Sequence, residues 1–407
     1  MAERNRASGA ALLVVIWALA VIGAVVAAYF GRGLLEVKLA QDLRQEMEAR
    51  ALAQAGLACF IRRFLDDRDG TDDAGSAWLF AGDDAPPDFP EGSVEVRVAD
   101  LGSRINLNLD GEDGLLQAFG GRREPVDAIL DWRDADDEPR TGGAEADYYA
   151  GLTPPMRAAN GMFRSPEEAL LVKGLAKFPR TLANETTVFG RANPNLIGTE
   201  TWTAILVAAG FDELRVELLS EQFTQVRGDA IKAGRVPFAQ PDDLKQLQSA
   251  TYLTLERLLP YLTFTGRINP NLASERSLRA ALAVLGVQAD KAKAIVAARD
   301  AAPFRELGAL QGFLVKTDQK LVSKDWTDQV FTLQTTLAGV EIVGKTKSGA
   351  LHRLVAVVER FHPPRETELW QCRFLYWREW PGEGFPVLPE EDGEQGAGEP
   401  ELEETAG

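Results

Sequence analysis

The sequence predicts an α+β protein in which a long N-terminal helix packs on an antiparallel sheet and a large α-helical domain is inserted between the strands. Three observations lead to this class. A helical stretch near the N-terminus is free of proline, one alternating segment follows it, and several more alternating segments lie near the C-terminus. The segment between them is mostly helical in pattern and broken by Gly and Pro, so the strands can share one sheet if the helical part is an insertion.

The composition favours a globular protein and argues against two functional classes. The chain has 407 residues, 45% of them hydrophobic, which is enough for a large core. Its net charge of −17 repels phosphate backbones and anionic lipid headgroups but is compatible with divalent cations. Because only His352 and His362 are present, catalysis by a histidine-bound metal is not expected.

The first element is an apolar segment long enough to cross a membrane. Residues 10–30 contain no charged side chain and follow a leader, 1–9, that carries Arg4 and Arg6. A helix of this length spans about 31 Å, which matches a hydrocarbon core of about 30 Å. A secretory signal peptide is the rival interpretation, but its apolar core is usually shorter and ends at a small-residue cleavage site. The basic flank places the N-terminus in the cytoplasm and the remaining chain across the membrane.

The same helix is expected to continue to residue 65 as an amphipathic stalk. No proline interrupts residues 10–65, so one helix of about 84 Å can cross the membrane and extend beyond it. Apolar side chains recur every fourth residue while charged side chains fill other faces, and this stripe requires a partner surface. The stripe consists of Leu35, Leu39, Leu43, Met47 and Ala51.

The leader ending in Gly9, the apolar helix starting at Ala10 and the amphipathic continuation resemble type IV prepilins and type II secretion pseudopilins. This resemblance implies that a prepilin peptidase cuts between Gly9 and Ala10 and that the new N-terminal amine is methylated. Most members carry Glu as the fifth residue after the cut, where this sequence has Val14. The K-type minor pseudopilins (general secretion pathway protein K family) lack this Glu, and the sequence is identified as a member of that class. Such a Glu would pair with the amine of the subunit above, so its absence suits the top of a filament.

The resemblance also implies a domain plan, partners and a location. The chain would form the tip of the periplasmic pseudopilus with I- and J-type minor pseudopilins, on the inner-membrane secretion platform, and support export of folded proteins across the outer membrane. It would be a single-pass inner-membrane protein and not an enzyme. The expected parts are a leader (1–9), a transmembrane helix (10–30), the stalk and first part of a pilin-like domain (31–101), an inserted α-helical domain (102–325), C-terminal strands (326–380) and an acidic disordered tail (381–407).

The strands are predicted from alternating apolar and polar residues. The first, at 93–99, follows a loop at 66–91 that is rich in Asp, Gly and Pro. Further strand signals lie at 330–336, 340–345, 350–360 and 368–379.

The helical part contains an internal repeat. Three copies of an Asn-x-Asn-Leu motif, starting at Ile105, Ala192 and Ile268, are each followed by a helical segment and a Gly. We expect an Asn to cap the following helix and the Gly to end it. The recurrence predicts related small helical modules of helix-hairpin-helix or SAM-like type.

The third copy raises an alternative function, a membrane-tethered DNA-binding or DNA-uptake receptor. It continues in a pattern that resembles a helix-hairpin-helix unit, whose DNA-binding versions use a Gly-x-Gly turn to offer backbone amides to phosphate. Here the turn has Gly286 but Gln288 replaces the second Gly, and Lys291 and Lys293 are the nearby cations. The net charge of −17 argues against nucleic-acid binding.

The acidic loop at 131–149 is the densest chemical feature. Seven carboxylates crowd into 17 residues, and Pro139, Gly142 and Gly143 allow the loop to fold back. Hard oxygen donors on such a loop suit Ca²⁺, although the spacing departs from the EF-hand. Mutual repulsion of the carboxylates favours a bound cation, and the K-type resemblance implies structural calcium in the inserted domain. The candidate ligands are Asp131, Asp134, Asp136, Asp137, Glu145 and Asp147, with Glu138 as the seventh carboxylate.

Two other interpretations of this loop stay open. It can be a solvated acidic loop without an ion, or a catalytic carboxylate pair as in glycoside hydrolysis. The sequence gives no further support to the catalytic interpretation, since neither a nucleophile elbow nor a phosphate loop accompanies the carboxylates.

The two cysteines, Cys59 and Cys372, allow at most one disulfide. In a pilin fold the sheet packs on the long helix, so a bridge between them is conceivable. The alternative is that both are small buried residues.

Overall fold

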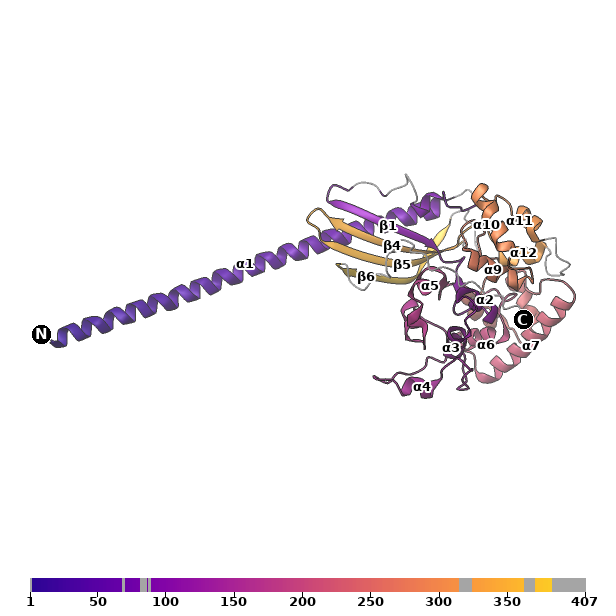
Figure 1. The fold of residues 1–407 in the computed structure, drawn as a ribbon, viewed down its shortest axis with the longest axis horizontal. Helices are drawn as coiled ribbons and strands as arrows, with labels where there is room; N and C mark the ends of the chain where they lie inside the picture. The colour runs from indigo at the N-terminus through magenta and orange to yellow at the C-terminus, as the bar shows by residue number, and fades with distance from the viewer. Residues whose placement is uncertain are drawn as a thin grey trace, which may run out of the picture.

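The protein consists of a long N-terminal helix, a four-stranded sheet packed on its C-terminal half, and a helical region beyond the sheet (Figure 1). This computed structural model describes residues 2–67, 70–80, 86, 89–314, 324–361 and 370–382. His362 and nearly all of the tail predicted at 381–407 lie outside these residues.

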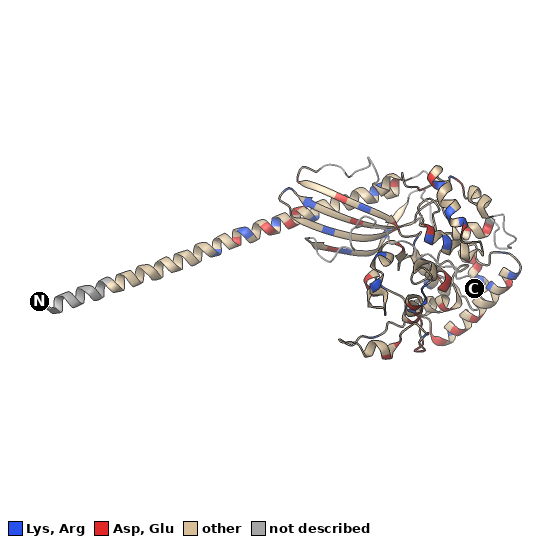
Figure 2. Ribbon diagram, in the orientation of Figure 1, with Lys and Arg blue, Asp and Glu red and all other residues tan. Residues whose placement is uncertain are grey.

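Helix α1 runs from Ala2 to Asp66, which confirms the uninterrupted helix predicted to residue 65. By length and composition its first half is apolar enough to cross a membrane. Large side chains such as Trp17 and Phe30 are about 70% exposed there (72% and 68%), as lipid-facing residues would be. Figure 2 shows that the described part of this half carries no charged side chain before the stalk.

The sheet is antiparallel, with the strand order β1-β4-β5-β6. The helical region lies in the chain between β1 and β4, so distant strands share one sheet as predicted. The bounds are β1 Gly92–Asp100, β4 Leu337–Thr346, β5 Leu351–Phe361 and β6 Gln371–Pro381.

The strand predicted at 330–336 is wrong. Val330 ends helix α12, Lys324–Val330, and Phe331 makes only an isolated bridge to Ile268. The apolar residues Trp326 and Val330 are four apart and both pack into the core of the helical region, so their spacing is helical.

Helix α1 packs closely on one face of the sheet. Its apolar residues contact inward-facing side chains of β1, β4 and β5 in a shared core. Gly56 of α1 and Gly344 of β4 permit this approach, since a Cβ on either would overlap the opposite element. The core includes Leu52, Ala53, Leu57, Phe60, Phe64, Val94, Ile342, Leu354, Ala356 and Val358.

The helical region repeats one unit three times within the described residues. Each unit is a pair of helices joined by a turn whose Gly has positive φ, namely Gly120 (62°), Gly210 (76°) and Gly286 (66°). The prediction that Gly ends the first helix of each unit is therefore confirmed. The pairs are α2 Glu112–Ala118 with α3 Arg123–Arg133, α6 Thr199–Ala208 with α7 Glu213–Lys232, and α9 Glu275–Val284 with α10 Lys291–Ala301.

The predicted capping role of the Asn motifs is wrong. The helices α2, α6 and α9 instead begin after Gly111, Gly198 and Ser274. In every motif the side-chain oxygen of the first Asn accepts the backbone N–H of the second at 2.9 Å. The second Asn then pairs in both directions with the backbone of a distant phenylalanine, at 2.7–3.0 Å, which satisfies both the N–H and the C=O of that buried residue. These clamps are Asn108–Phe163, Asn195–Phe238 and Asn271–Phe304.

An arginine on the second helix of each unit completes the repeat. Arg133, Arg227 and Arg299 each donate to a backbone carbonyl within or just after the Asn motif of their own unit. The acceptors are the carbonyls of Leu107, Ile197 and Pro270, respectively. Motif, helix pair and phenylalanine segment are thereby tied together.

The remaining elements are short; η1, Ala77–Leu79, packs beside α1 and β1, and the others connect or flank the helical units. These others are β2 Ile105–Asn106, α4 Ala146–Ala150, η2 Pro166–Leu171, η3 Leu175–Lys177, α5 Pro179–Asn184, β3 Thr186–Thr187, η4 Pro241–Gln246, α8 Tyr252–Leu258, η5 Leu259–Tyr261 and α11 Leu307–Leu314. Strands β2 and β3 pair in parallel.

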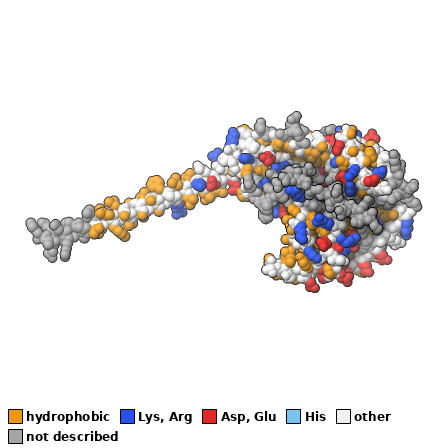
Figure 3. Space-filling model, in the orientation of Figure 1, with side chains coloured by type: hydrophobic (Ala, Val, Ile, Leu, Met, Phe, Trp, Pro, Cys, Tyr) orange, Lys and Arg blue, Asp and Glu red, His pale blue; other side chains and the backbone are white. Residues whose placement is uncertain are grey.

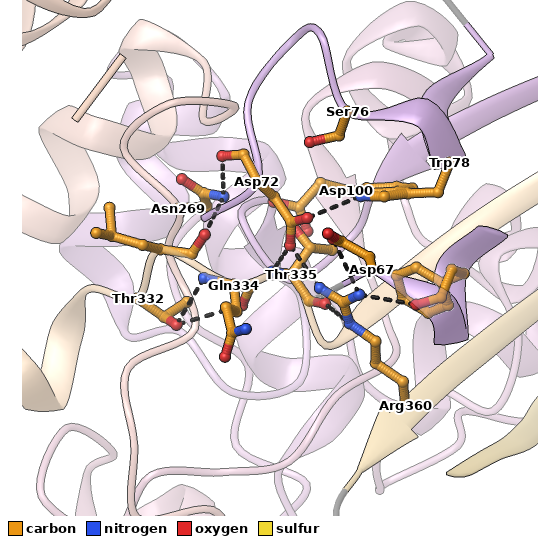
Figure 4. Close-up of polar contacts among 12 residues, drawn as sticks. Asp67, Asp72, Ser76, Trp78, Asp100, Asn269, Thr332, Gln334, Thr335 and Arg360 are labelled. Atoms are coloured by element: carbon orange, nitrogen blue, oxygen red, sulfur yellow. Dashed lines mark hydrogen bonds and ion pairs between the residues drawn. The ribbon is translucent and has the colours of Figure 1, made fainter. Parts of the chain in front are cut away.

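A buried arginine joins helix α1, the sheet and the third unit. Arg360 of β5 donates to the carbonyls of Phe64 (2.8 Å) and Thr335 (2.6 Å) and to the carboxylate of Asp72 (2.6 Å). The Asp72 carbonyl accepts the side-chain amide of Asn269 at 3.0 Å. Figure 4 shows these residues converging from separate parts of the chain.

Candidate metal site

The acidic loop is an insertion in the first unit. In the second and third units the clamped phenylalanine follows the second helix by six residues (Lys232 to Phe238) and three residues (Ala301 to Phe304). In the first unit, Phe163 follows Arg133 by thirty residues. The acidic loop and α4 occupy this extra segment, and Ala144 and Tyr149 from it pack into the core of the first unit.

Three of the predicted ligands meet in space. Asp134 follows α3, Asp136 lies in the loop, and Glu145 directly precedes α4. Each offers a carboxylate oxygen, and these oxygens lie within 4.8 Å of one another. Such a spacing allows one cation to contact all three.

Three carboxylate oxygens of this cluster lack hydrogen-bond partners among the described residues. Glu145 is only 5% exposed, and neither of its oxygens has a hydrogen-bond partner among the residues that the structure describes. The same is true of Oδ1 of Asp134. Because an unpaired buried charge costs on the order of several kcal/mol, the donor set fits a cation.

The electrostatics of the cluster agree with its geometry. Burial, followed by the charges of Asp131, Asp134, Asp136 and Asp137, raises the pKa of Glu145 to about 7. Burial also raises the pKa of Asp134, although its hydrogen bond from Arg140 acts in the opposite direction. A divalent ion would offset the carboxylate repulsion that adds to the effect of burial at Glu145.

The other three predicted ligands lie in different surroundings. Asp131 is fully buried and accepts from Arg140, at 2.7 Å from Nη1 and at 3.1 Å from the backbone N–H. Asp137 accepts the side-chain amide of Asn160 at 3.1 Å. Asp147 is exposed on the first turn of α4. The structure therefore places Asp134, Asp136 and Glu145 together and these three outside that group.

Two residues that the sequence analysis missed belong to this site, Arg140 and Asn160. Arg140 is one of only two basic residues in the segment 131–149, the other being Arg133 on α3, and this is a signal that sequence inspection could have used. Asn160 lies beyond α4 and has no such signal. Asp134 and Asp136 also line a cleft of about 1350 Å³ between the first two units, so an ion can reach the site from solvent.

The apolar stripe predicted on the stalk is exposed. Leu35, Leu39, Leu43 and Met47 are 53–71% exposed, and Figure 3 shows hydrophobic side chains along the stalk. Gly9 and Ala10 lie within α1.

Cys59 and Cys372 are both free thiols in this structure, so the conceivable bridge is not formed. Both are half-buried, on α1 and β6, and burial raises the pKa of the Cys372 thiol.

The comparisons with known proteins agree on one family. The family model for the first domain of protein K of the type II secretion system matches residues 104–180, which hold the first unit and the acidic loop. Type II secretion system protein K is 30% identical over 206 residues in Aeromonas hydrophila, 31% over 198 in Pectobacterium carotovorum and 29% over 200 in Pseudomonas aeruginosa. These matches cover 43%, 42% and 42% of this chain, and 61%, 60% and 58% of the relatives, so the chain spans about three fifths of their length.

A solved structure was also found. In the crystal structure of the GspK-GspI-GspJ complex from enterotoxigenic Escherichia coli, one chain aligns with a TM-score of 0.41 and 12% identity, over 86% of this chain and 99% of that one. The matched domain and the relatives therefore show that the chain is similar to protein K of type II secretion systems over about two fifths of its length.

Proposed function

We propose that the protein is a minor pseudopilin that forms the tip of the periplasmic pseudopilus and so supports export of folded proteins across the outer membrane. One observation carries the proposal: the helical region lies at the end of the sheet farthest from the N-terminus (Figure 1). A chain anchored through the first half of α1 would hold that region farthest from the membrane. Val14, which leaves no carboxylate for the amine of a subunit above, supports the same position.

The partners in this proposal are I- and J-type minor pseudopilins and the inner-membrane secretion platform. The N-terminus would lie in the cytoplasm and the sheet and helical region in the periplasm. The α1–sheet unit would act as a pilin-like domain, with the exposed stripe of the stalk packing on partner helices. The role is structural rather than enzymatic. The DNA-receptor alternative gains no support from the relatives, which are secretion proteins.

A structural calcium ion is also part of the proposal. Asp134, Asp136 and Glu145 would hold it, since their oxygens converge and three of them lack other partners among the described residues. The ion would neutralise the carboxylates and fix the acidic loop against α4.

Co-purification tests the assembly role. The double substitution Leu39→Glu and Leu43→Glu should abolish co-purification with I- and J-type pseudopilins, because it charges the stripe that buries against them. The exposed Lys38 provides a matched control: Lys38→Glu also changes the net charge by −2, on another face of the helix. Equal recovery of the partners with both variants would contradict assembly through the stripe.

A further inference from the structure

We infer that Arg140 is a positioning residue of the cation site: it holds Asp131 and Asp134 in place and leaves Asp136, Glu145 and one oxygen of Asp134 for a divalent ion. The inference rests on the proposed calcium site.

Arg140 neutralises the carboxylate of Asp131, which is buried and already bonded, and so leaves the other carboxylates for an ion. Asp131 is 0% exposed, and both of its oxygens accept hydrogen bonds from Arg140, one from Nη1 and one from the backbone N–H. Gly143 packs directly against this carboxylate, where a Cβ would overlap Oδ2. Asp131 is therefore enclosed by its own loop and serves as the anchor for Arg140.

The same guanidinium fixes the direction of Asp134. Nη1 of Arg140 lies 2.5 Å from Oδ2 of Asp134, while Oδ1 is buried without a partner among the described residues. A carboxylate held through one oxygen presents the other in a fixed direction. In this way Arg140 orients one oxygen toward the cluster that includes Glu145 and Asp136.

The two cations that bond to the loop from nearby positions, Arg140 and Lys173, do not contact Glu145 in the part of the chain that the structure describes. Arg140 contacts Asp131, Asp134 and, at 3.8 Å, Glu200. Lys173 donates to the carbonyls of Gly142 (3.3 Å) and Gly143 (2.8 Å). Both of these cations therefore hold the loop rather than Glu145, whose charge still requires a partner from solution.

A positioning role and a simple charge effect predict opposite changes in calcium affinity when Arg140 is replaced. As a positive charge beside the site, Arg140 repels a cation, so Arg140→Gln would raise calcium affinity if charge alone mattered. As a positioning residue it supports a ligand, and losing such support lowers metal affinity by about 10- to 100-fold. We expect the lower affinity.

The experiment is a titration of the full-length protein in detergent, stripped with a chelator and then titrated calorimetrically with CaCl₂. Arg157→Gln is the matched control, because Arg157 is an exposed arginine that lines the same cleft and its loss changes the charge equally. Arg157→Gln should leave the affinity unchanged or slightly higher, and Arg140→Gln should lower it about tenfold or more.

Arg140→Lys provides a second test in case Arg140→Gln does not fold. Lysine retains the charge but lacks the planar fork that contacts two carboxylates, so its calcium affinity should fall between those of the wild type and Arg140→Gln. Wild-type affinity or higher in either folded variant would overturn the positioning role while leaving the calcium site intact. Failure of the wild type itself to bind Ca²⁺ would instead overturn the site and, with it, this inference.

Discussion

At the scale of single residues, Asp72 determines how the junction around Arg360 responds to pH. Its side chain is fully buried, accepts from Trp78 Nε1 at 2.8 Å and faces Arg360. Burial first, and then a hydrogen bond shared with Asp67, raise the pKa of Asp72 to about 7, against the lowering effect of Arg360. Because the folded-state pKa lies above the value of 3.8 for an unperturbed carboxyl, this group contributes stability below about pH 4 that is lost as the pH rises through 7.

The substitution Asp72→Asn tests the direction of this change in stability with pH. Asparagine resembles the protonated acid but cannot titrate, so its cost should be greatest near pH 4 and shrink by an amount on the order of a few kcal/mol as the pH rises past 7. The measurement is the free energy of unfolding in urea at several pH values. Asp113→Asn, at an exposed carboxyl on α2, should show no such trend. A cost for Asp72→Asn that grows with pH would contradict the raised pKa.

The acidic loop shows what residue-level prediction from sequence can achieve. Composition located the cluster and named all three of its converging carboxylates, Asp134, Asp136 and Glu145. Which carboxylates converge depends on hydrogen bonds within the folded loop, above all those of Arg140 to Asp131. No spacing rule encodes that choice, so the set of six candidates could not be divided in advance.

At the scale of elements, the strands show which patterns can be read from sequence. Alternation placed β1, β4, β5 and β6 within about three residues of their observed bounds, because each has one face on the core. It failed at 330–336, where a short apolar run combines a helix end with an irregular segment. Short apolar runs of this kind do not distinguish the periodicity of a helix from that of a strand.

The Asn clamps mark a second limit of prediction at this scale. The repeat itself was visible, but the partners Phe163, Phe238 and Phe304 lie 55, 43 and 33 residues from their asparagines. The equal separation of Gly and Arg in the first and third units, from Gly120 to Arg133 and from Gly286 to Arg299, is a signal that inspection could have used.

Removing one clamp should destabilise its unit. Asn195→Ala leaves the buried N–H and C=O of Phe238 without partners, which should cost about 2 to 3 kcal/mol. Thermal unfolding followed by circular dichroism measures the loss. Asn184→Ala, at an exposed position at the end of α5, is the matched control and should unfold at the wild-type temperature. If both variants unfold alike, Asn195 does not act as a clamp.

At the scale of the whole molecule, the chain combines an apolar anchor, a sheet on the same helix and a rigidly clamped helical region at the far end (Figure 1). The helix that would lie in the membrane continues without a break into the core of the sheet domain. Because this helix is uninterrupted, its placement in the membrane determines where the helical region lies. Processing of its N-terminus therefore bears on the placement of the whole chain.

The proposed maturation of that N-terminus gives the last prediction. The wild type, recovered from membranes, should lack residues 1–9 and begin with a methylated Ala10, as intact-mass spectrometry would show. Gly9→Val should retain the leader, because the prepilins that this leader resembles are cut after a Gly, whereas Ser8→Ala should be processed normally. Both variants should stay in the membrane fraction, since residues 10–30 are untouched. Normal cleavage of Gly9→Val would contradict the pseudopilin assignment of the leader, and a mature chain starting beyond residue 30 would identify the apolar segment as a secretory signal peptide instead.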